Sequence, residues 1–138
     1  MERLLKFYIN GEWVVPQSTE TMPVLNPASA DQVAEVALGN EADVDVAVAA
    51  AKAAFEHFSQ TSKSERLALL RRIRLVSERR FEELAQAMRL EMGAPITMAR
   101  EAQADAAIGH LDGFIHALEK QEEQERFDNG EVVLKEPI

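Results

Sequence analysis

Apolar positions along the chain follow two patterns, and the change between them predicts a strand-rich front and a helical middle. In the first 38 residues, short apolar runs are separated by polar turns. Asn10-Gly11 lies between two such runs, and both residues tolerate the positive φ that a two-residue type I′ hairpin turn requires. Pro16 ends the second run. The four predicted strands cover residues 6–9, 12–15, 21–27 and 32–38.

Apolar residues then recur at helical spacing, beginning with a helix that is rich in alanine. Asn40 is placed to cap its first turn, where Glu41 and Asp43 favour the positive end of the helix dipole. The alanines predict a face that packs closely against another element. The apolar stripe consists of Val44, Val48, Ala51, Ala54 and Phe55.

The next helical pattern covers residues 61–93 and predicts the longest helix of the chain. Ser62 and Glu65 have the spacing of a capping box, in which the serine bonds forward and the glutamate reaches back. Arginines and glutamates occupy the side opposite the apolar face. That face includes Leu70, Ile73, Leu84 and Met88.

Gly93-Ala94-Pro95 follows this helix and admits two interpretations, a binding loop or a joint between helices. Gly93 stands where a left-handed residue commonly ends a helix. Pro95 can occupy the first turn of the next helix without losing a needed hydrogen bond. Local physics therefore favours the joint, with a third helix from Pro95 to Gln121. A turn at Asn129-Gly130 and a strand-like tail over 131–138 complete the plan.

Composition limits the classes of function. The 138 residues are 46% hydrophobic and 28% charged, as in an ordinary globular domain. The net charge of −9 and the mixing of arginines with glutamates disfavour a nucleic-acid partner. The absence of cysteine excludes disulfides, thiolate metal sites and a cysteine nucleophile within this sequence. No apolar run resembles a signal peptide or a membrane span, so we expect a cytoplasmic protein without a membrane partner.

A search for catalytic chemistry finds no converging set of groups. His57, His110 and His116 lack the spacing of a helical zinc site, so surface or packing roles are favoured. No nucleophile elbow or glycine-rich phosphate loop is present. The acidic pairs Glu82-Glu83 and Glu122-Glu123 suit solvated helix faces. Asp105 and Asp112 lie among small and apolar residues, where each can be a structural hydrogen-bond acceptor or can face a cation.

The order of the motifs carries more information than any single one. Along the chain stand INGEW, LNPAS, VAEVALG, EADVDVAVAAAKAAF, SERLALLRRI, LEMGAP and NGEVVLKEPI. From Phe7 to Ile138 this order resembles the N-terminal part of the NAD(P)-dependent aldehyde dehydrogenase superfamily. The resemblance implies an α/β fold, the first part of a Rossmann-type cofactor domain that is mainly helical, with a β-hairpin front and a C-terminal strand. Residues 1–138 would then be an incomplete dinucleotide-binding domain, without the catalytic domain.

The same resemblance implies that the catalytic machinery lies outside these residues. Family members are much longer, and their oxyanion-holding asparagine, glycine-containing cofactor loop, general-base glutamate and nucleophilic cysteine follow the position that matches Ile138. We therefore expect no catalytic and no cofactor-binding residue here. NAD or NADP would serve the parent enzyme, and neither is expected to bind this chain alone.

Many family members also hold a structural monovalent cation near the matching segment. By position, the carbonyl of Val24 and the carboxylate of Asp105 match two of its ligands, and a third would come from outside this sequence.

Two functional hypotheses follow. The first is a truncated N-terminal portion of an aldehyde dehydrogenase, inactive alone, whose partners are the rest of that chain and further copies in a homo-oligomer. The alternative is a non-catalytic helical interaction module that self-associates or docks on a full-length paralogue, because unpartnered apolar helix faces favour association. An independent enzyme acting through the histidines and acids is the least favoured.

Overall fold

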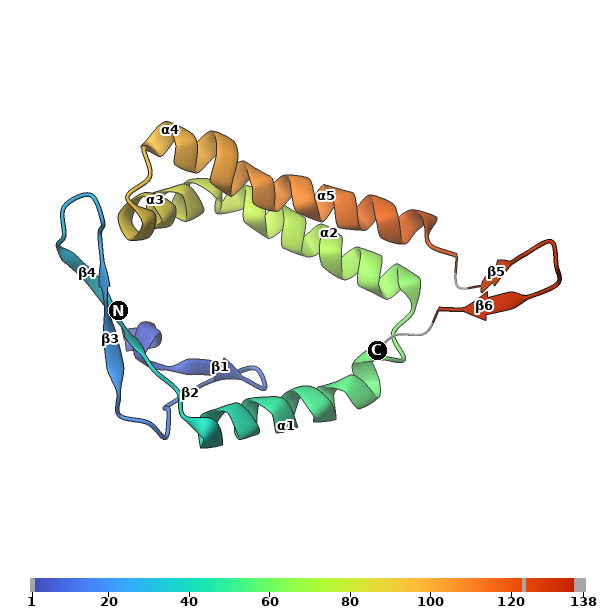
Figure 1. Cartoon of the computed structure of the whole chain (residues 1–138), viewed down its shortest axis with the longest axis horizontal. Coiled ribbons are helices and arrows are strands. Elements are labelled where there is room, and N and C mark those ends of the chain that lie inside the picture. The colour runs from blue at the N-terminus through green and yellow to red at the C-terminus, as the bar shows by residue number, and fades with distance from the viewer. Residues whose placement is uncertain (1, 123, 136–138) are drawn as a thin grey trace.

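The computed structural model describes residues 2–122 and 124–135, arranged as strand pairs at the front, a helical middle and a final hairpin (Figure 1). Helices α2 and α5 lie side by side, α1 runs along the opposite side, and the β5–β6 hairpin projects beyond the helices. In chain order the elements are η1 (Glu2–Leu5), β1 (Phe7–Ile9), β2 (Glu12–Val14), β3 (Thr21–Leu25), β4 (Gln32–Ala37), α1 (Glu41–Phe58), α2 (Lys63–Arg79), α3 (Phe81–Met92), α4 (Ile96–Met98), the π-helix η2 (Ala99–Ala104), α5 (Asp105–Lys120), β5 (Gln124–Arg126) and β6 (Val132–Leu134).

The predicted front hairpin is confirmed. Strands β1 and β2 pair antiparallel, with Ile9 opposite Glu12. Asn10 and Gly11 both have positive φ, 52° and 83°, as a type I′ turn requires. The rings of Tyr8 and Trp13 face each other across the strands with their centroids 5.3 Å apart. Strands β3 and β4 form the second predicted pair, also antiparallel.

Both predicted helix caps are confirmed. The Asn40 side chain accepts a hydrogen bond from the Asp43 N–H, and the Asp43 carboxylate accepts one from the Asn40 N–H. Ser62 and Glu65 form the same reciprocal arrangement at the start of α2. Each box satisfies backbone donors that a helix start otherwise leaves unpaired.

The prediction of one long helix over 61–93 is wrong, because the helix breaks at Arg80. That residue has φ −104° and ψ 14°, outside the helical region, and α3 begins at Phe81. The break serves packing: Ala85 of α3 is fully buried against η2, and Phe81 packs beside it. A continuous helix would carry this face away from η2.

The joint after α3 is confirmed in its main feature and corrected in detail. Gly93 is left-handed, with φ 66°, as predicted. Pro95 is extended, with φ −55° and ψ 138°, so it precedes α4 instead of lying in its first turn. The Pro95 carbonyl accepts a hydrogen bond from the Ala99 N–H. The third helix, predicted as continuous from Pro95 to Gln121, is interrupted by the π-helix η2. There the Asp105 N–H donates to the carbonyl of Arg100, five residues earlier, as in a π-helix.

The tail is a hairpin, of which only one strand was predicted. The apolar strand β6 pairs antiparallel with β5 around Asn129-Gly130. Strand β5 was missed because its residues, Gln124 to Arg126, are all polar and exposed. Residues 136–138 of the predicted strand lie outside the described residues.

Few side chains are buried in this structure. The core consists of Ala85, Ala99 and Ala104, and no large side chain of the described residues is fully buried. The accessible surface is 10548 Å², whereas a compact monomer of 15.4 kDa exposes about 7,200 Å². The fold therefore leaves surface open that a compact protein of this size would cover.

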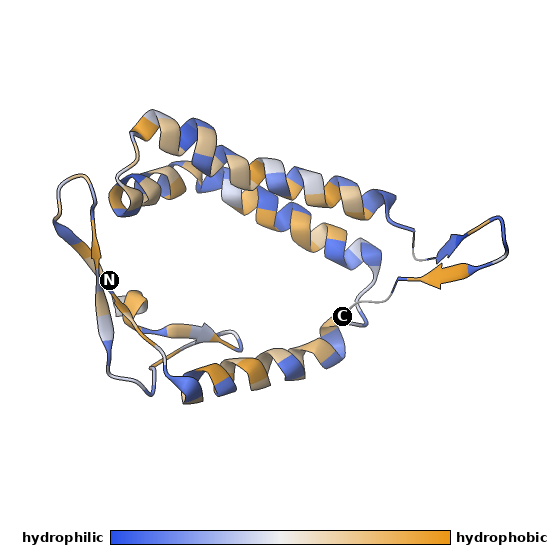
Figure 2. Ribbon diagram, viewed as in Figure 1, coloured by the Kyte–Doolittle hydropathy of each residue, from blue (hydrophilic) through white to orange (hydrophobic). Residues whose placement is uncertain are grey.

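Helix α1 shows this openness most clearly, as its apolar residues are visible along the ribbon in Figure 2. Val44 and Val48 of the predicted stripe are 58% and 56% exposed, so the expected close packing fails on that side. The alanine side does meet another element: Ala47 and Ala50 line a surface depression together with Ile9 of the front hairpin.

Candidate functional site

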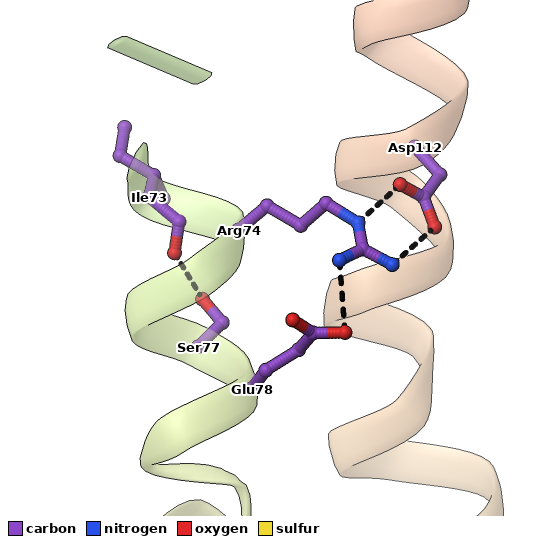
Figure 3. Close-up of polar contacts among 5 residues, drawn as sticks. All are labelled: Ile73, Arg74, Ser77, Glu78 and Asp112. Atoms are coloured by element: carbon purple, nitrogen blue, oxygen red, sulfur yellow. Dashed lines mark hydrogen bonds and ion pairs between the residues drawn. The ribbon is translucent and has the colours of Figure 1, made fainter. Parts of the chain in front are cut away.

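Arg74 is the centre of a polar cluster that joins α2 to α5 (Figure 3). Its guanidinium donates to both carboxylate oxygens of Asp112 and pairs with Glu78 at 2.8 Å. These bonds lower the pKa of Asp112 and raise that of Arg74. Because all three of its nitrogens bond to these carboxylates, Arg74 acts as a clamp between helices. Asp112 is thus a structural acceptor, one of the two roles that its sequence setting allowed.

Further polar contacts join the same two helices. Arg71 pairs with Glu119 at 2.6 Å. The Lys63 ammonium donates to the carbonyls of Glu119 and Gln121 at 2.8 and 2.9 Å, where it neutralises the C-terminal end of α5. These groups position the two helices relative to each other.

The acidic pair Glu82-Glu83 is exposed and held by arginines, in agreement with its predicted role on a solvated face. Glu82 accepts two hydrogen bonds from Arg100, and Glu83 accepts from Arg80. The bonds from Arg100, and next the one from Gln86, lower the pKa of Glu82 to about 2. A general acid needs a raised carboxyl pKa, so this environment shifts Glu82 in the opposite direction.

The two predicted cation ligands lie on different elements. Val24 is in β3, opposite Ala34, directly before the register shift of that strand pair. Asp105 is the exposed first residue of α5 and lines an open depression of about 290 Å³ with Glu101 and Arg100. A carbonyl and a carboxylate are hard oxygen donors, so their chemistry suits a hard cation. Two ligands do not complete a coordination shell, and the site stays a prediction.

No histidine of the described residues joins a metal-binding group. His57 lies in the last turn of α1, while His110 and His116 are exposed on α5. Within residues 2–122 and 124–135, no group of three or more histidine, aspartate, glutamate or cysteine side chains is placed to hold a metal ion. Nor is any helix in this range both long and apolar enough to cross a membrane.

Gly93-Ala94-Pro95 is a packing joint. A Cβ atom on Gly93 would lie 2.9 Å from Cγ of Pro27 and 3.2 Å from the backbone nitrogen of Ala28. The loop between β3 and β4 therefore occupies the space beside the glycine. Of the two interpretations of this tripeptide, the structure supports the joint between helices.

The structural roles of two arginines, Arg66 and Arg74, were not predicted from the sequence. Arg66 donates to the Thr61 hydroxyl and the Ser59 carbonyl and lies over the Phe58 ring, so it holds the turn between α1 and α2. The glutamate four residues after Arg74 was a usable signal, because arginine and glutamate at this spacing pair on a helix. The partners of Arg66 are backbone and hydroxyl groups, which leave no such pattern.

Comparison with known proteins identifies the architecture. The sequence model of the aldehyde dehydrogenase family matches residues 13–138. A Staphylococcus aureus protein (strain bovine RF122 / ET3-1), named as an aldehyde dehydrogenase, is 41% identical over the whole chain. The crystal structure of aldehyde dehydrogenase from Bartonella henselae superposes on 91% of the chain with a TM-score of 0.88 and 37% identity. A mutant of aldehyde dehydrogenase C from Pseudomonas syringae, in complex with NAD⁺ and octanal, superposes equally well at 44% identity.

The match covers all of this chain but only part of each relative. The chain spans 29% of the length of the Staphylococcus aureus protein and 26% of each of the two solved structures. In those structures it corresponds to the N-terminal part. The 138-residue chain thus belongs to the aldehyde dehydrogenase family.

Proposed function

We propose that these residues form the first part of the dinucleotide-binding domain of an NAD(P)-dependent aldehyde dehydrogenase, which oxidises an aldehyde to a carboxylic acid, and that they have no activity alone. The observation that carries the proposal is the superposition at a TM-score of 0.88 over 91% of the chain. Aldehyde dehydrogenases from Pseudomonas syringae and Mycobacterium tuberculosis are described in complex with NAD⁺, which supports NAD as the cofactor of the parent enzyme. In that enzyme the segment is scaffold, and a homo-oligomer in the cytoplasm is its expected setting.

The open surface supports the scaffold role. The chain exposes about 3,300 Å² more than a compact monomer of its mass. Much of this surface is apolar, as at Val44, Phe55 and Phe58 of α1. Burial of apolar surface is the main favourable term in folding, so covering these residues with the rest of an enzyme would stabilise both parts.

A chimera tests the proposal. In the Staphylococcus aureus relative, the matching segment would be replaced by these 138 residues. We expect the chimera to form NADH when an aldehyde is supplied, whereas the relative without any such segment forms none. Aldehyde-dependent NADH formation by the isolated 138-residue chain would contradict the proposal. So would a folded chimera that binds NAD⁺ and remains inactive with every aldehyde the relative oxidises.

The same exposed apolar residues favour the second candidate function, an interaction module. Val44, Val48, Ala51, Phe55 and Phe58 follow one another at steps of four and three residues along α1, and all are exposed. Such steps form the seam of a coiled coil. An interaction module would give a defined oligomer that unfolds cooperatively, whereas a scaffold segment on its own would aggregate or unfold gradually. Sedimentation and thermal unfolding of the chain distinguish the two.

We also propose that Val24 and Asp105 contribute two oxygen ligands to a monovalent cation in the parent enzyme. Replacing sodium and potassium by choline at constant ionic strength should lower the melting temperature of the chimera. Asp105→Asn should abolish this cation dependence, and Asp45→Asn, which removes the same charge from an exposed position of α1, should preserve it. An unchanged cation response in Asp105→Asn would refute this assignment.

A further inference from the structure

The tripeptide Asn-Gly-Glu occurs twice in the chain, each time in the turn of a hairpin. Asn10-Gly11-Glu12 connects β1 to β2, and Asn129-Gly130-Glu131 lies between β5 and β6. Both asparagines are exposed, and the two glycines have similar φ, 83° and 87°. The chain therefore contains two copies of the same three residues that differ in their surroundings.

The hydrogen bonds of the two turns are different. In the second turn, Asn129 Oδ1 accepts from the Glu131 N–H at 3.0 Å, and the Gly130 N–H donates to the Phe127 carbonyl at 2.9 Å. In the first turn, neither the Asn10 side chain nor the Gly11 N–H has a hydrogen-bond partner among the residues that the structure describes. Apart from the two neighbouring residues, no atom lies within 4 Å of the position that a Cβ on Gly11 would occupy, and Gly11 is exposed, so water reaches this backbone.

We propose that Asn10 is a site of spontaneous deamidation and that Asn129 is protected from the same reaction. The deprotonated Gly11 nitrogen attacks Cγ of Asn10 and forms a five-membered imide. The Cγ–Nδ2 bond breaks and the nitrogen leaves as ammonia. Water then opens the imide at either carbonyl and gives aspartate or isoaspartate, so the net change is gain of one water and loss of one ammonia. Glycine permits this attack because it carries no Cβ beside the nucleophile.

The two products have different structural consequences. Aspartate tolerates the left-handed conformation of residue 10 as asparagine does. Isoaspartate adds a backbone atom to a turn whose geometry requires two residues, so the register that places Tyr8 opposite Trp13 is lost. Trp13 is the single tryptophan of the chain, and its fluorescence reports on this change.

The experiment follows both sites in one sample. The chimera described above, in which these residues are part of a complete enzyme, is incubated at mildly alkaline pH in water enriched in oxygen-18, so that only deamidation during the incubation incorporates the label. Trypsin then separates the peptide that contains Asn10 from that containing Asn129, and tandem mass spectrometry assigns the label to each asparagine and gives both rates. Asn10 should react about tenfold faster, because two hydrogen bonds must break before Asn129 can react.

Repeating the incubation in denaturing urea provides the control, since unfolding removes the structural difference but leaves both tripeptides intact. We expect the two rates to converge. Equal rates in the absence of urea, a faster reaction at Asn129, or a ratio that urea leaves unchanged would each overturn the proposal. The variant Asn10→Asp forms isoaspartate more slowly than asparagine does. It should therefore keep the Trp13 fluorescence of the unreacted chain.

Discussion

Replacing Gly93 with alanine is expected to lower the free energy of unfolding by about 2–4 kcal/mol. Two costs combine at this position. The left-handed φ of 66° is unfavourable for a residue with a Cβ. The new methyl group would also lie 2.9 Å from Pro27 and 3.2 Å from the Ala28 backbone, so the loop between β3 and β4 must move. Urea unfolding of the chimera, followed by far-ultraviolet circular dichroism, measures the loss.

Gly11→Ala is the matched control. Gly11 has a positive φ of 83°, but a Cβ there would meet no atom within 4 Å outside its two neighbouring residues. It therefore carries the backbone cost alone, about 1–2 kcal/mol. The difference between the two variants isolates the contact between the helix joint and the strand loop. Equal losses would mean that the loop moves aside freely and that the joint does not hold it.

Asp43→Asn is expected to cause the second large loss of stability, because it weakens the link between the front of the chain and α1. The Asp43 side chain is buried, and its carboxylate accepts from the Gln17 N–H at 2.7 Å, the Asn40 N–H at 3.0 Å and the Ser18 N–H at 3.3 Å. An amide keeps one acceptor oxygen and presents an NH₂ group to donors. Asp45→Asn removes the same charge from an exposed position two residues away and should change the midpoint of urea unfolding little.

The effect of Asp43 should depend on pH in a definite direction. The backbone bonds from Gln17 and then Asn40 lower the pKa of Asp43 below its ordinary value of 3.8. A carboxyl with a lowered pKa in the folded state stabilises the fold above its ordinary pKa and loses that contribution as the pH falls through its folded pKa. The gap between wild type and Asp43→Asn should thus be full at neutral pH and shrink in acid below 3.8. A gap that is constant across this range would show that the ionised form of Asp43 is not what stabilises the link.

Features that depend on a few neighbouring residues were predictable from the sequence. Asn10-Gly11 specifies its turn because both residues accept positive φ. Asn40 and Ser62 specify helix starts because each finds its partner three residues later in the same segment. Gly93 specifies a helix end for an equally local reason.

Features that depend on distant packing were missed. The helix pattern continues through Arg80, and only the contact of Phe81 and Ala85 with η2 explains the break. The π-helix has a similar origin. Ala99 and Ala104 are five residues apart, and the wider turn brings both toward one side, where both are fully buried. A sequence of small residues with good helix propensity contains no sign of this constraint.

In the candidate site, too, features set by neighbouring residues were predictable and features set by distant contacts were not. The absence of cysteine and of phosphate-binding loops is read directly from the sequence. Asp112 could not be assigned from the sequence, since its partner Arg74 lies 38 residues away on another helix.

The three-alanine core has a consequence for the response of the chain to temperature. The heat capacity increase on unfolding arises mainly from newly exposed apolar surface. A chain that already exposes much of its apolar surface when folded exposes little more on unfolding, so its heat capacity increase is small. The enthalpy and entropy of unfolding then vary weakly with temperature, and the stability curve is shallow. The strong curvature that confines a compact enzyme to a limited temperature range would arise only once these helices are covered.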